Sequence, residues 1–221
     1  MNSPAEVAVP RPVRLQIGRD ALNGDLTVPW DATGLVIFAH GSGSSRHSAR
    51  NKRVAEVLHR GRLATLLLDL LTEQEETIDL RTAEFRFDIP RLGDRVVGAV
   101  DWAEAHPELA SLRIGLFGAS TGAAAALIGA ARRPGAVRAV VSRGGRPDLA
   151  DAALEHVVAP TLLIIGGRDD VVIALNQEAF ARLKEPKSLE IIPAATHLFE
   201  EPGAMEQVSN LATSWFRRFL L

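Results

Sequence analysis

The stretch Gly115-Leu116-Phe117-Gly118-Ala119-Ser120-Thr121-Gly122 decides the fold of this 221-residue chain. The apolar run Leu112–Phe117 predicts a buried strand, and the alanine-rich segment that ends in Arg132-Arg133-Pro134-Gly135 predicts a helix. A serine in a Gly-x-Ser-x-Gly turn between a strand and a helix takes a strained backbone conformation, which only small neighbours allow. We therefore interpret Gly118–Gly122 as a nucleophile elbow.

The elbow pattern also has a purely structural interpretation. Five-residue patterns recur by chance, and small residues at Gly118, Ala119 and Gly122 could serve only the close packing of a strand against a helix. In the functional interpretation, the helix that starts after Ser120 directs its unpaired N–H groups and its positive dipole end at a developing oxyanion. The choice between the structural and the functional interpretation depends on which residues the other strands place near Ser120.

Short apolar strands alternate with amphipathic helices along the chain, which predicts an α/β fold with a mostly parallel sheet and helices on both faces. The first two strands are expected to form a hairpin with Asn23-Gly24 as turn residues near its middle. The expected strands are Val13–Ile17, Ala21–Val28, Leu35–Ala39, Leu63–Leu68, Leu112–Phe117, Val137–Val141, Thr161–Ile165 and Leu189–Ile192. Besides the alanine-rich helix, the expected helices are Ser48–His59, Asp88–Ala105, Asp148–His156, Ala174–Leu183 and a C-terminal helix that carries Met205 and Phe219, while Thr72–Thr77 is expected to be a solvated loop.

Length and composition favour one sizeable domain, which we place at residues 13–221 after an N-terminal extension at 1–12. The net charge of −2 without a basic block argues against nucleic acid or an anionic membrane as a partner. No apolar run is long enough to span a bilayer, and the first dozen residues lack the order of a signal peptide, so we expect a cytoplasmic protein.

The absence of two residue types excludes several chemistries. The chain has no cysteine, which rules out disulfides, thiolate metal sites and a cysteine nucleophile. It has no tyrosine, which rules out the tyrosine-based proton donor of short-chain dehydrogenases. If the protein is an enzyme with a nucleophilic side chain, that side chain is not a cysteine.

Ligand chemistry in a parallel sheet collects at the carboxyl ends of the strands. The segments expected there are His40–Arg46, Asp69, Ser120, Ser142–Arg146, Gly166–Asp170 and Ala194–His197. They supply a hydroxyl, a carboxylate and an imidazole in the chain order Ser, Asp, His, which is the order found in α/β-hydrolases.

The three candidate catalytic residues follow from what a serine nucleophile needs. The Ser120 hydroxyl requires a base that titrates near neutral pH, and His197 is the histidine placed to reach it, although it could also be an ordinary loop histidine. Asp169 would fix the tautomer of that imidazole, with Asp170 as the rival carboxylate and the expected helix N-cap. His40 is expected to order its own loop by hydrogen bonding. No His or Glu stands at ligand spacing from the Asp pair, so we expect no metal.

The oxyanion hole is expected to consist of the backbone N–H groups of Thr121 and Ser42. The loop that carries Ser42 has a competing interpretation, because Gly41-Ser42-Gly43 with Asp69 at the end of the next strand imitates a dinucleotide fingerprint. Arg46 stands where the third glycine should be. We therefore favour the oxyanion interpretation and expect no cofactor.

Four motifs together resemble one family. They are His40-Gly41-Ser42-Gly43-Ser44-Ser45-Arg46, Gly118-Ala119-Ser120-Thr121-Gly122, Gly166-Gly167-Arg168-Asp169 and Thr196-His197. From about residue 13 to its end, the chain resembles the dienelactone-hydrolase-like branch of the α/β-hydrolases, and more narrowly small esterase-type members sometimes joined to phosphoribosyltransferase domains. The resemblance implies Ser120 as nucleophile, Asp169 as acid, His197 as base, and Ser42 and Thr121 as oxyanion donors. Dienelactone hydrolases proper carry cysteine at the elbow, so the serine here argues against a dienelactone substrate and is typical of esterases.

Two features bear on the substrate. The segment between Ser142 and Thr161 has room for a single helix, so no cap domain is expected and the site should be open and shallow. Arg143 and Arg146 flank Gly144-Gly145 near the working edge of the sheet, and either could hold a substrate carboxylate or phosphate, or be an ordinary solvated or salt-bridged arginine.

The sequence thus predicts a serine hydrolase that cleaves small carboxylic esters through an acyl-enzyme intermediate. A thioesterase or acyltransferase would use the same three residues, and a non-catalytic binding protein on the same fold is the alternative outside enzymes. Both a monomer and a homodimer agree with the sequence.

Overall fold

The structure is a computed structural model that describes residues 9–184 and 186–221. Residues 1–8 of the expected N-terminal extension lie outside the described part, and the first strand begins at Arg11, two residues before the predicted domain boundary. The strands are β1 Arg11–Ile17, β2 Asp20–Thr27, β3 Gly34–Ala39, β4 Leu63–Leu68, β5 Arg113–Ala119, β6 Val137–Arg143, β7 Thr161–Gly166 and β8 Lys187–Ile192. The helices are α1 Ala49–Arg60, α2 Glu73–Thr82, α3 Ile89–Ala105, α4 Thr121–Arg132, the 3₁₀ helix η1 Pro147–His156, α5 Asp170–Arg182 and α6 Ala204–Leu220.

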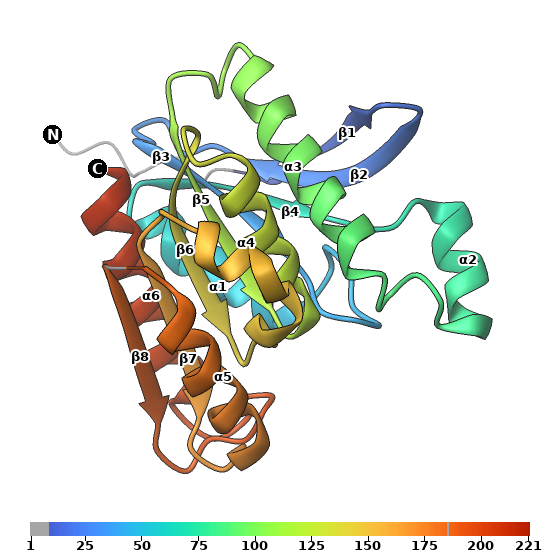
Figure 1. The fold of residues 1–221 in the computed structure, drawn as a ribbon. Helices are drawn as coiled ribbons and strands as arrows, with labels where there is room; N and C mark the ends of the chain where they lie inside the picture. The colour runs from blue at the N-terminus through green and yellow to red at the C-terminus, as the bar shows by residue number, and fades with distance from the viewer. Residues whose placement is uncertain (1–8, 185) are drawn as a thin grey trace, which may run out of the picture.

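The strands form one eight-stranded sheet in the order β1-β2-β4-β3-β5-β6-β7-β8 (Figure 1). The β1/β2 and β2/β4 pairs are antiparallel, and every other neighbouring pair is parallel. The chain reverses its direction of travel across the sheet beside β3 and β5, so the loops after these two strands lie at a topological switch point, where ligands bind in such sheets.

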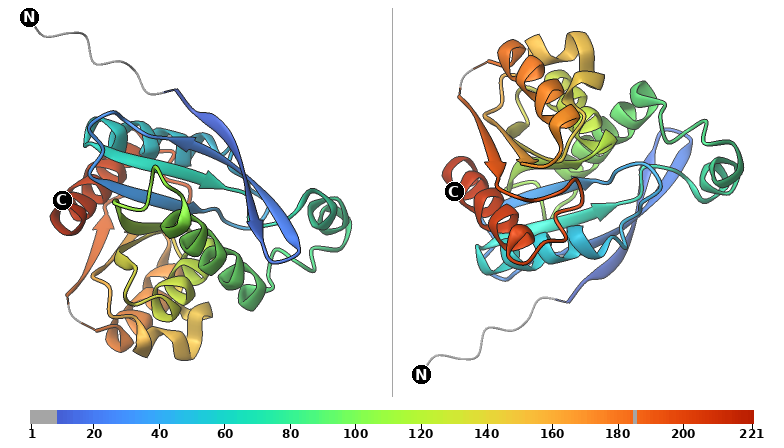
Figure 2. Two further views of the ribbon diagram at one scale, coloured as in Figure 1. Left: turned by 90° about the horizontal axis from the view of Figure 1, so that it is seen from above. Right: turned by 90° about the horizontal axis from the view of Figure 1, so that it is seen from below.

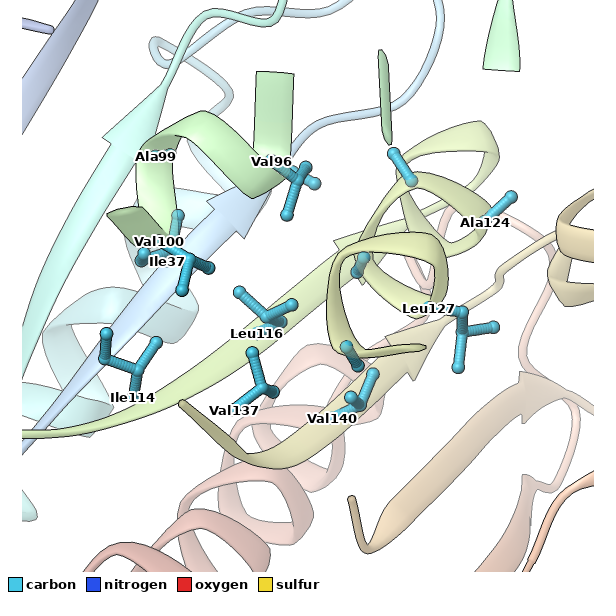
Figure 3. Close-up of a cluster of buried hydrophobic side chains, with 14 of the residues drawn as sticks. Ile37, Val96, Ala99, Val100, Ile114, Leu116, Ala124, Leu127, Val137 and Val140 are labelled. Atoms are coloured by element: carbon cyan, nitrogen blue, oxygen red, sulfur yellow. The ribbon is translucent and has the colours of Figure 1, made fainter. Parts of the chain in front are cut away.

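Helices cover both faces of the sheet, as the sequence predicts. Figure 2 shows α3, α4, η1 and α5 on one face and α1 and α6 on the other. Each face has its own apolar cluster, because successive side chains of a strand point to opposite sides. Figure 3 shows the first cluster, in which Ile37, Leu116 and Val140 of three neighbouring strands lie beside Val96 of α3 and Leu127 of α4. The two clusters hold the carboxyl ends of β3, β5, β6 and β7 in fixed positions.

Three local predictions from the sequence were wrong in informative ways. The hairpin turns at Gly18, which has a φ of +59°, and Asn23-Gly24 lies inside β2 instead. The segment after Thr72 is the helix α2, because Thr72 and Glu75 form a reciprocal capping box that stabilises its first turn. The helix expected from Ala174 begins at Asp170, since its β-branched first turn obscured the helical pattern.

Between β6 and β7 the chain forms only η1, so no cap domain is present. The helix expected at Asp148–His156 is found there as a 3₁₀ helix rather than an α-helix. In the described part of the chain, no helix is both long and apolar enough to cross a bilayer.

Candidate active site

Ser120 lies at the turn between β5 and α4 with a backbone conformation of φ 51° and ψ −126°. A side chain at positive φ costs conformational energy, so the surrounding structure must hold it in place. Three backbone hydrogen bonds do so: the Ser120 N–H donates to the Arg143 carbonyl at 3.4 Å, and the Ser120 carbonyl accepts from the N–H groups of Ala123 at 3.1 Å and Arg146 at 3.0 Å. The strained turn expected from the sequence is present in the structure.

Small residues around the turn are required by close backbone contacts. A Cβ atom on Gly118 would lie 2.4 Å from Cα of Ala123, and one on Gly122 would lie 2.2 Å from the carbonyl oxygen of Ala39. Gly41 contacts the serine itself, because its Cβ would lie 2.8 Å from Cβ of Ser120. The close packing that the structural interpretation requires is therefore present, and it leaves Ser120 partly exposed.

Replacing Gly122 with alanine should destabilise the protein by about 3 kcal/mol, because the atom that the new methyl group meets is backbone and cannot rotate away. The free energy of unfolding from urea denaturation measures this loss. Gly135→Ala is the matched control, since a Cβ at Gly135 has nothing within 4 Å. Equal unfolding free energies for the two variants would contradict the role given to the close contact.

Asp169 and His197 lie close together in the loops that follow β7 and β8. Asp169 follows β7 in a turn closed by its N–H to the Gly166 carbonyl at 3.1 Å, and the chain passes close to the loop after β8, where a Cβ on Gly166 would lie 2.5 Å from the Thr196 carbonyl oxygen. The Asp169 Oδ2 and the His197 Nδ1 are 2.7 Å apart. The acid and base predicted from the sequence are therefore paired.

The expected N-cap at Asp170 is not found. Asp169 occupies the N-cap position of α5, and Asp170 is the first residue of the helix. The Asp169 carboxylate makes no capping hydrogen bond. It is turned toward His197 instead, and this orientation is what a catalytic orienting carboxylate needs.

The segment between β6 and η1 links the serine turn to the histidine. Ser120 makes backbone hydrogen bonds to Arg143 and Arg146, and a Cβ on the intervening Gly144 would lie 3.6 Å from the His197 Nδ1. Within residues 9–184 and 186–221, no hydrogen bond joins the Ser120 hydroxyl to the His197 ring. Such bonds are often long in unliganded enzymes and shorten when substrate binds.

The two proposed oxyanion donors lie next to each other. Thr121 is the first residue of α4, so its N–H has no acceptor within the helix. The Ser42 N–H donates to the Thr121 hydroxyl at 2.9 Å. This contact was not predicted from the sequence. An oxyanion bound here would either share the Ser42 N–H with the Thr121 hydroxyl or displace that hydroxyl as its acceptor.

His40 fixes the start of the loop that carries Ser42, as expected. Its Nδ1 lies 2.9 Å from the Gly41 carbonyl oxygen, and its Nε2 accepts the Leu70 N–H at 3.0 Å. Because one ring nitrogen must donate and the other must accept, the ring is a neutral Nδ1–H tautomer. Burial lowers the pKa of His40 below its usual 6.5, which keeps the ring neutral.

The structure argues against the dinucleotide interpretation of this loop, because the acidic residue of the fingerprint, Asp69, is bound to Arg46. Asp69 accepts a hydrogen bond from the Arg46 N–H at 2.7 Å, and its other oxygen pairs with the Arg46 guanidinium. The carboxylate that would have to bind a ribose is thus used to hold the loop. The residue that replaces the third glycine of the fingerprint is the one that engages Asp69.

Two histidines with lowered pKa values should make stability depend on pH. Burial also lowers the pKa of His59, to about 4, so the folded chain keeps both His40 and His59 neutral where the unfolded chain protonates near 6.5. The unfolded state then binds more protons, and the free energy of unfolding should fall as the pH drops from about 7 toward 4. Urea denaturation at several pH values measures the slope. His40→Gln should reduce the slope, because His59 still contributes, whereas the exposed His156→Gln should leave it unchanged; a pH-independent stability would contradict the lowered pKa values of His40 and His59.

The structure separates the two candidate arginines. Arg146 forms a two-pronged ion pair with Asp148, with Nε 2.9 Å and Nη2 2.8 Å from the carboxylate, which matches the salt-bridged alternative. Arg143 is the last residue of β6 rather than a loop residue, and its side chain is buried at 8% exposure. Its burial had no signal in the sequence, because β6 is two residues longer than its apolar run.

A cavity of about 160 Å³ opens beside the loop that carries Ser42. It is lined by residues 40–44, by Leu70, Leu71 and Leu92, and by Glu76, Asp79, Leu80 and Arg86. Arg86 donates to Asp79 at 2.6 Å. The cavity is apolar over most of its surface and lies next to Gly41, which touches Ser120. It has room for one small apolar group.

Comparisons with known proteins agree with this fold. Residues 32–220 match the model of the dienelactone hydrolase family. The crystal structure of a dienelactone hydrolase from Anabaena variabilis is 56% identical, covers 98% of this chain and 100% of its own, and superposes with a TM-score of 0.96. Est1E from Butyrivibrio proteoclasticus shares the fold at 16% identity, with a TM-score of 0.77 over 94% of this chain and 98% of its own.

A longer relative covers more than this domain. A Mycobacterium tuberculosis protein named "Putative phosphoribosyl transferase" is 55% identical over 204 residues, which are 92% of this chain and 45% of the relative. This chain therefore spans less than half of that protein. The sheet order, the strained serine turn and the family match lead to one conclusion: the chain belongs to the dienelactone hydrolase family and has the α/β-hydrolase fold.

Proposed function

We propose that this protein hydrolyses small carboxylic esters with Ser120 as nucleophile, His197 as base and Asp169 as the residue that orients the base. The observation that carries the proposal is the strained serine turn, in which Ser120 at φ 51° stands between β5 and the start of α4. A helix N-terminus directly behind a hydroxyl favours the negative charge that forms when the hydroxyl attacks a carbonyl. Esterases among the structural neighbours share the fold.

In the first step, the His197 Nε2 takes the proton of the Ser120 hydroxyl as the serine oxygen attacks the ester carbonyl. The 2.7 Å contact between Asp169 and Nδ1 places the ring proton on Nδ1, which leaves Nε2 unprotonated and able to act as a base. The resulting imidazolium then protonates the leaving alcohol, and an acyl-enzyme remains on Ser120. In the second step, His197 activates a water molecule that releases the acid.

The N–H groups of Thr121 and Ser42 stabilise the oxyanion in both steps. The hydroxyl of Thr121 holds the Ser42 N–H at 2.9 Å before substrate binds, so the loop is already close to α4 when the charge forms. When the charge forms, the Ser42 N–H turns from the Thr121 hydroxyl to the oxyanion or donates to both. The apolar cavity of about 160 Å³ beside Gly41 accommodates one of the two halves of the ester.

The proposal is tested by incubating the purified protein with a panel of esters, lactones and thioesters and with a fluorophosphonate probe. We expect hydrolysis of small esters, and mass spectrometry should locate the probe on Ser120. Faster turnover of thioesters than of matched esters would point to the thioesterase alternative. Labelling of another residue, or no labelling together with no turnover of any substrate, would contradict the proposal.

A further inference from the structure

Thr121 places a buried hydroxyl at the start of α4, one residue after Ser120. The residue is 4% exposed, and its Oγ1 accepts the Ser42 N–H at 2.9 Å. A hydroxyl also carries a hydrogen of its own, which it can donate. Within residues 9–184 and 186–221, the Thr121 hydroxyl donates no hydrogen bond. Its hydrogen is therefore free to bind a ligand.

Thr161 shows the other way in which this chain buries a threonine. It is 0% exposed, and its Oγ1 donates to the Ala159 carbonyl at 2.9 Å. A buried O–H group without an acceptor is unfavourable, because it has given up its hydrogen bond to water and has gained none in the protein. Thr121 carries such a free O–H group, whereas Thr161 does not.

The Thr121 hydroxyl lies next to both N–H groups that we propose as oxyanion donors. One of them is the N–H of Thr121 itself, which has no acceptor within α4 because Thr121 is the first residue of that helix. The other is the Ser42 N–H, whose nitrogen is 2.9 Å from the hydroxyl oxygen. An oxygen atom that accepts from both N–H groups therefore comes close to the hydroxyl as well.

The attacking serine lies at the same place. A Cβ on Gly41, the residue before Ser42, would lie 2.8 Å from Cβ of Ser120 and 3.6 Å from its Oγ. Thr121 follows Ser120 directly in the chain. A carbonyl carbon bonded to the Ser120 oxygen therefore holds its own oxygen within reach of Ser42 and Thr121.

The existing hydrogen bond prepares the hydroxyl to donate. Because the Thr121 oxygen accepts from Ser42, the hydroxyl hydrogen points away from that N–H and can turn toward a new acceptor without movement of a heavy atom. In a chain from N–H to O–H to an anion, each hydrogen bond polarises the next. A hydrogen bond to a charged oxygen is also stronger than one to a neutral carbonyl.

We propose that the side-chain hydroxyl of Thr121 is a third donor to the oxyanion, beside the backbone N–H groups of Thr121 and Ser42. This role rests on the proposed function, and it makes Thr121 a catalytic residue through its side chain. The Ser42 N–H keeps the hydroxyl as an acceptor while the hydroxyl donates to the oxyanion. Because the donated bond strengthens as the carbonyl oxygen gains charge, it stabilises the transition state more than the bound ester, so its loss should lower kcat and leave KM unchanged.

Replacing Thr121 with valine tests the donor by kinetics. Valine keeps the shape of the side chain and lacks the hydroxyl, so kcat for p-nitrophenyl acetate should fall about 100-fold. Thr121→Ser keeps a hydroxyl and should retain most of the wild-type kcat. Thr161→Val is the matched control, because it removes a hydroxyl from an equally buried threonine at the first residue of β7, and its kcat should equal that of the wild type.

Trifluoroacetone distinguishes donation to the oxyanion from mere positioning of the Ser42 loop. Addition of the Ser120 oxygen to this ketone leaves an oxyanion and no leaving group, so the adduct resembles the tetrahedral intermediate. In a crystal structure of the wild-type adduct, the Thr121 Oγ1 should lie about 2.5–3.0 Å from the oxyanion. Thr121→Val should weaken inhibition by the ketone by about the same factor as it lowers kcat.

Two results would overturn the role of the hydroxyl. In the first, the adduct forms on Ser120 but the Thr121 Oγ1 is turned away from the oxyanion. In the second, Thr121→Val hydrolyses the ester as fast as the wild type or faster, which would mean that the hydroxyl only occupies the Ser42 N–H. Both results leave Ser120 as the nucleophile, whereas a ketone that forms no adduct with Ser120 would contradict the proposed function and this role together.

Discussion

Replacing Ser120 with alanine is expected to lower kcat/KM for an activated ester by about a million-fold while leaving the fold intact. In the proposed mechanism the hydroxyl forms the acyl-enzyme, and without it only the oxyanion donors and substrate binding remain to accelerate attack by water. The backbone hydrogen bonds of Ser120 with Arg143, Ala123 and Arg146 do not involve the hydroxyl, so the turn should survive the change. Initial rates with p-nitrophenyl acetate and a circular dichroism melt measure the two effects.

Ser142→Ala is the control for this variant. Ser142 lies on the neighbouring strand β6, and in the described part of the chain its buried hydroxyl has no hydrogen-bond partner. Removing it should leave activity unchanged and should not lower stability, because a buried hydroxyl without a partner is unfavourable. Substantial ester hydrolysis by Ser120→Ala, at a level near that of Ser142→Ala, would show that another group is the nucleophile.

Replacing Asp169 with asparagine is expected to lower kcat by about ten-thousand-fold. An amide can donate its own hydrogen to the His197 Nδ1, which would place the ring proton on Nε2 and remove the lone pair that accepts the serine proton. The carboxylate also stabilises the imidazolium, and the neutral amide does not. The 2.7 Å contact between Asp169 and His197 is the geometry on which this expectation rests.

Asp170→Asn removes the same charge from the next residue and should retain nearly wild-type kcat, because Asp170 is the exposed first residue of α5. The two variants together separate a specific contact from a general loss of negative charge near the site. If both lose activity equally, Asp169 is not the orienting carboxylate.

The parts of the fold that the sequence predicts well are those with strong local patterns. The strand before Ser120 and the helix after it were predicted correctly because an apolar run, flanking glycines and an alanine-rich segment all agree. The pairing of Asp169 with His197 could be predicted because parallel strands bring their carboxyl ends to one edge. The α2 helix was missed although its Thr72-x-x-Glu75 capping box was readable, since the segment has almost no apolar face.

Other features of the site depend on contacts between residues far apart in the chain. Nothing around Ser42 in the sequence indicates that its N–H donates to the Thr121 hydroxyl. The different surroundings of Arg143 and Arg146 also had no local signal, because both flank the same pair of glycines. The Arg146 guanidinium pairs with Asp148, two residues away. The Arg143 guanidinium instead lies against Met205 of α6, which is formed by the last residues of the chain.

The strand order places β8 at the rim of the sheet, where it is paired only with β7. Rim strands fray more readily than central ones, and His197 belongs to the loop that β8 leads into. Warming the protein should therefore separate the base from its carboxylate while the centre of the sheet is still intact. Loss of turnover would then precede loss of secondary structure, and it would be reversible on cooling.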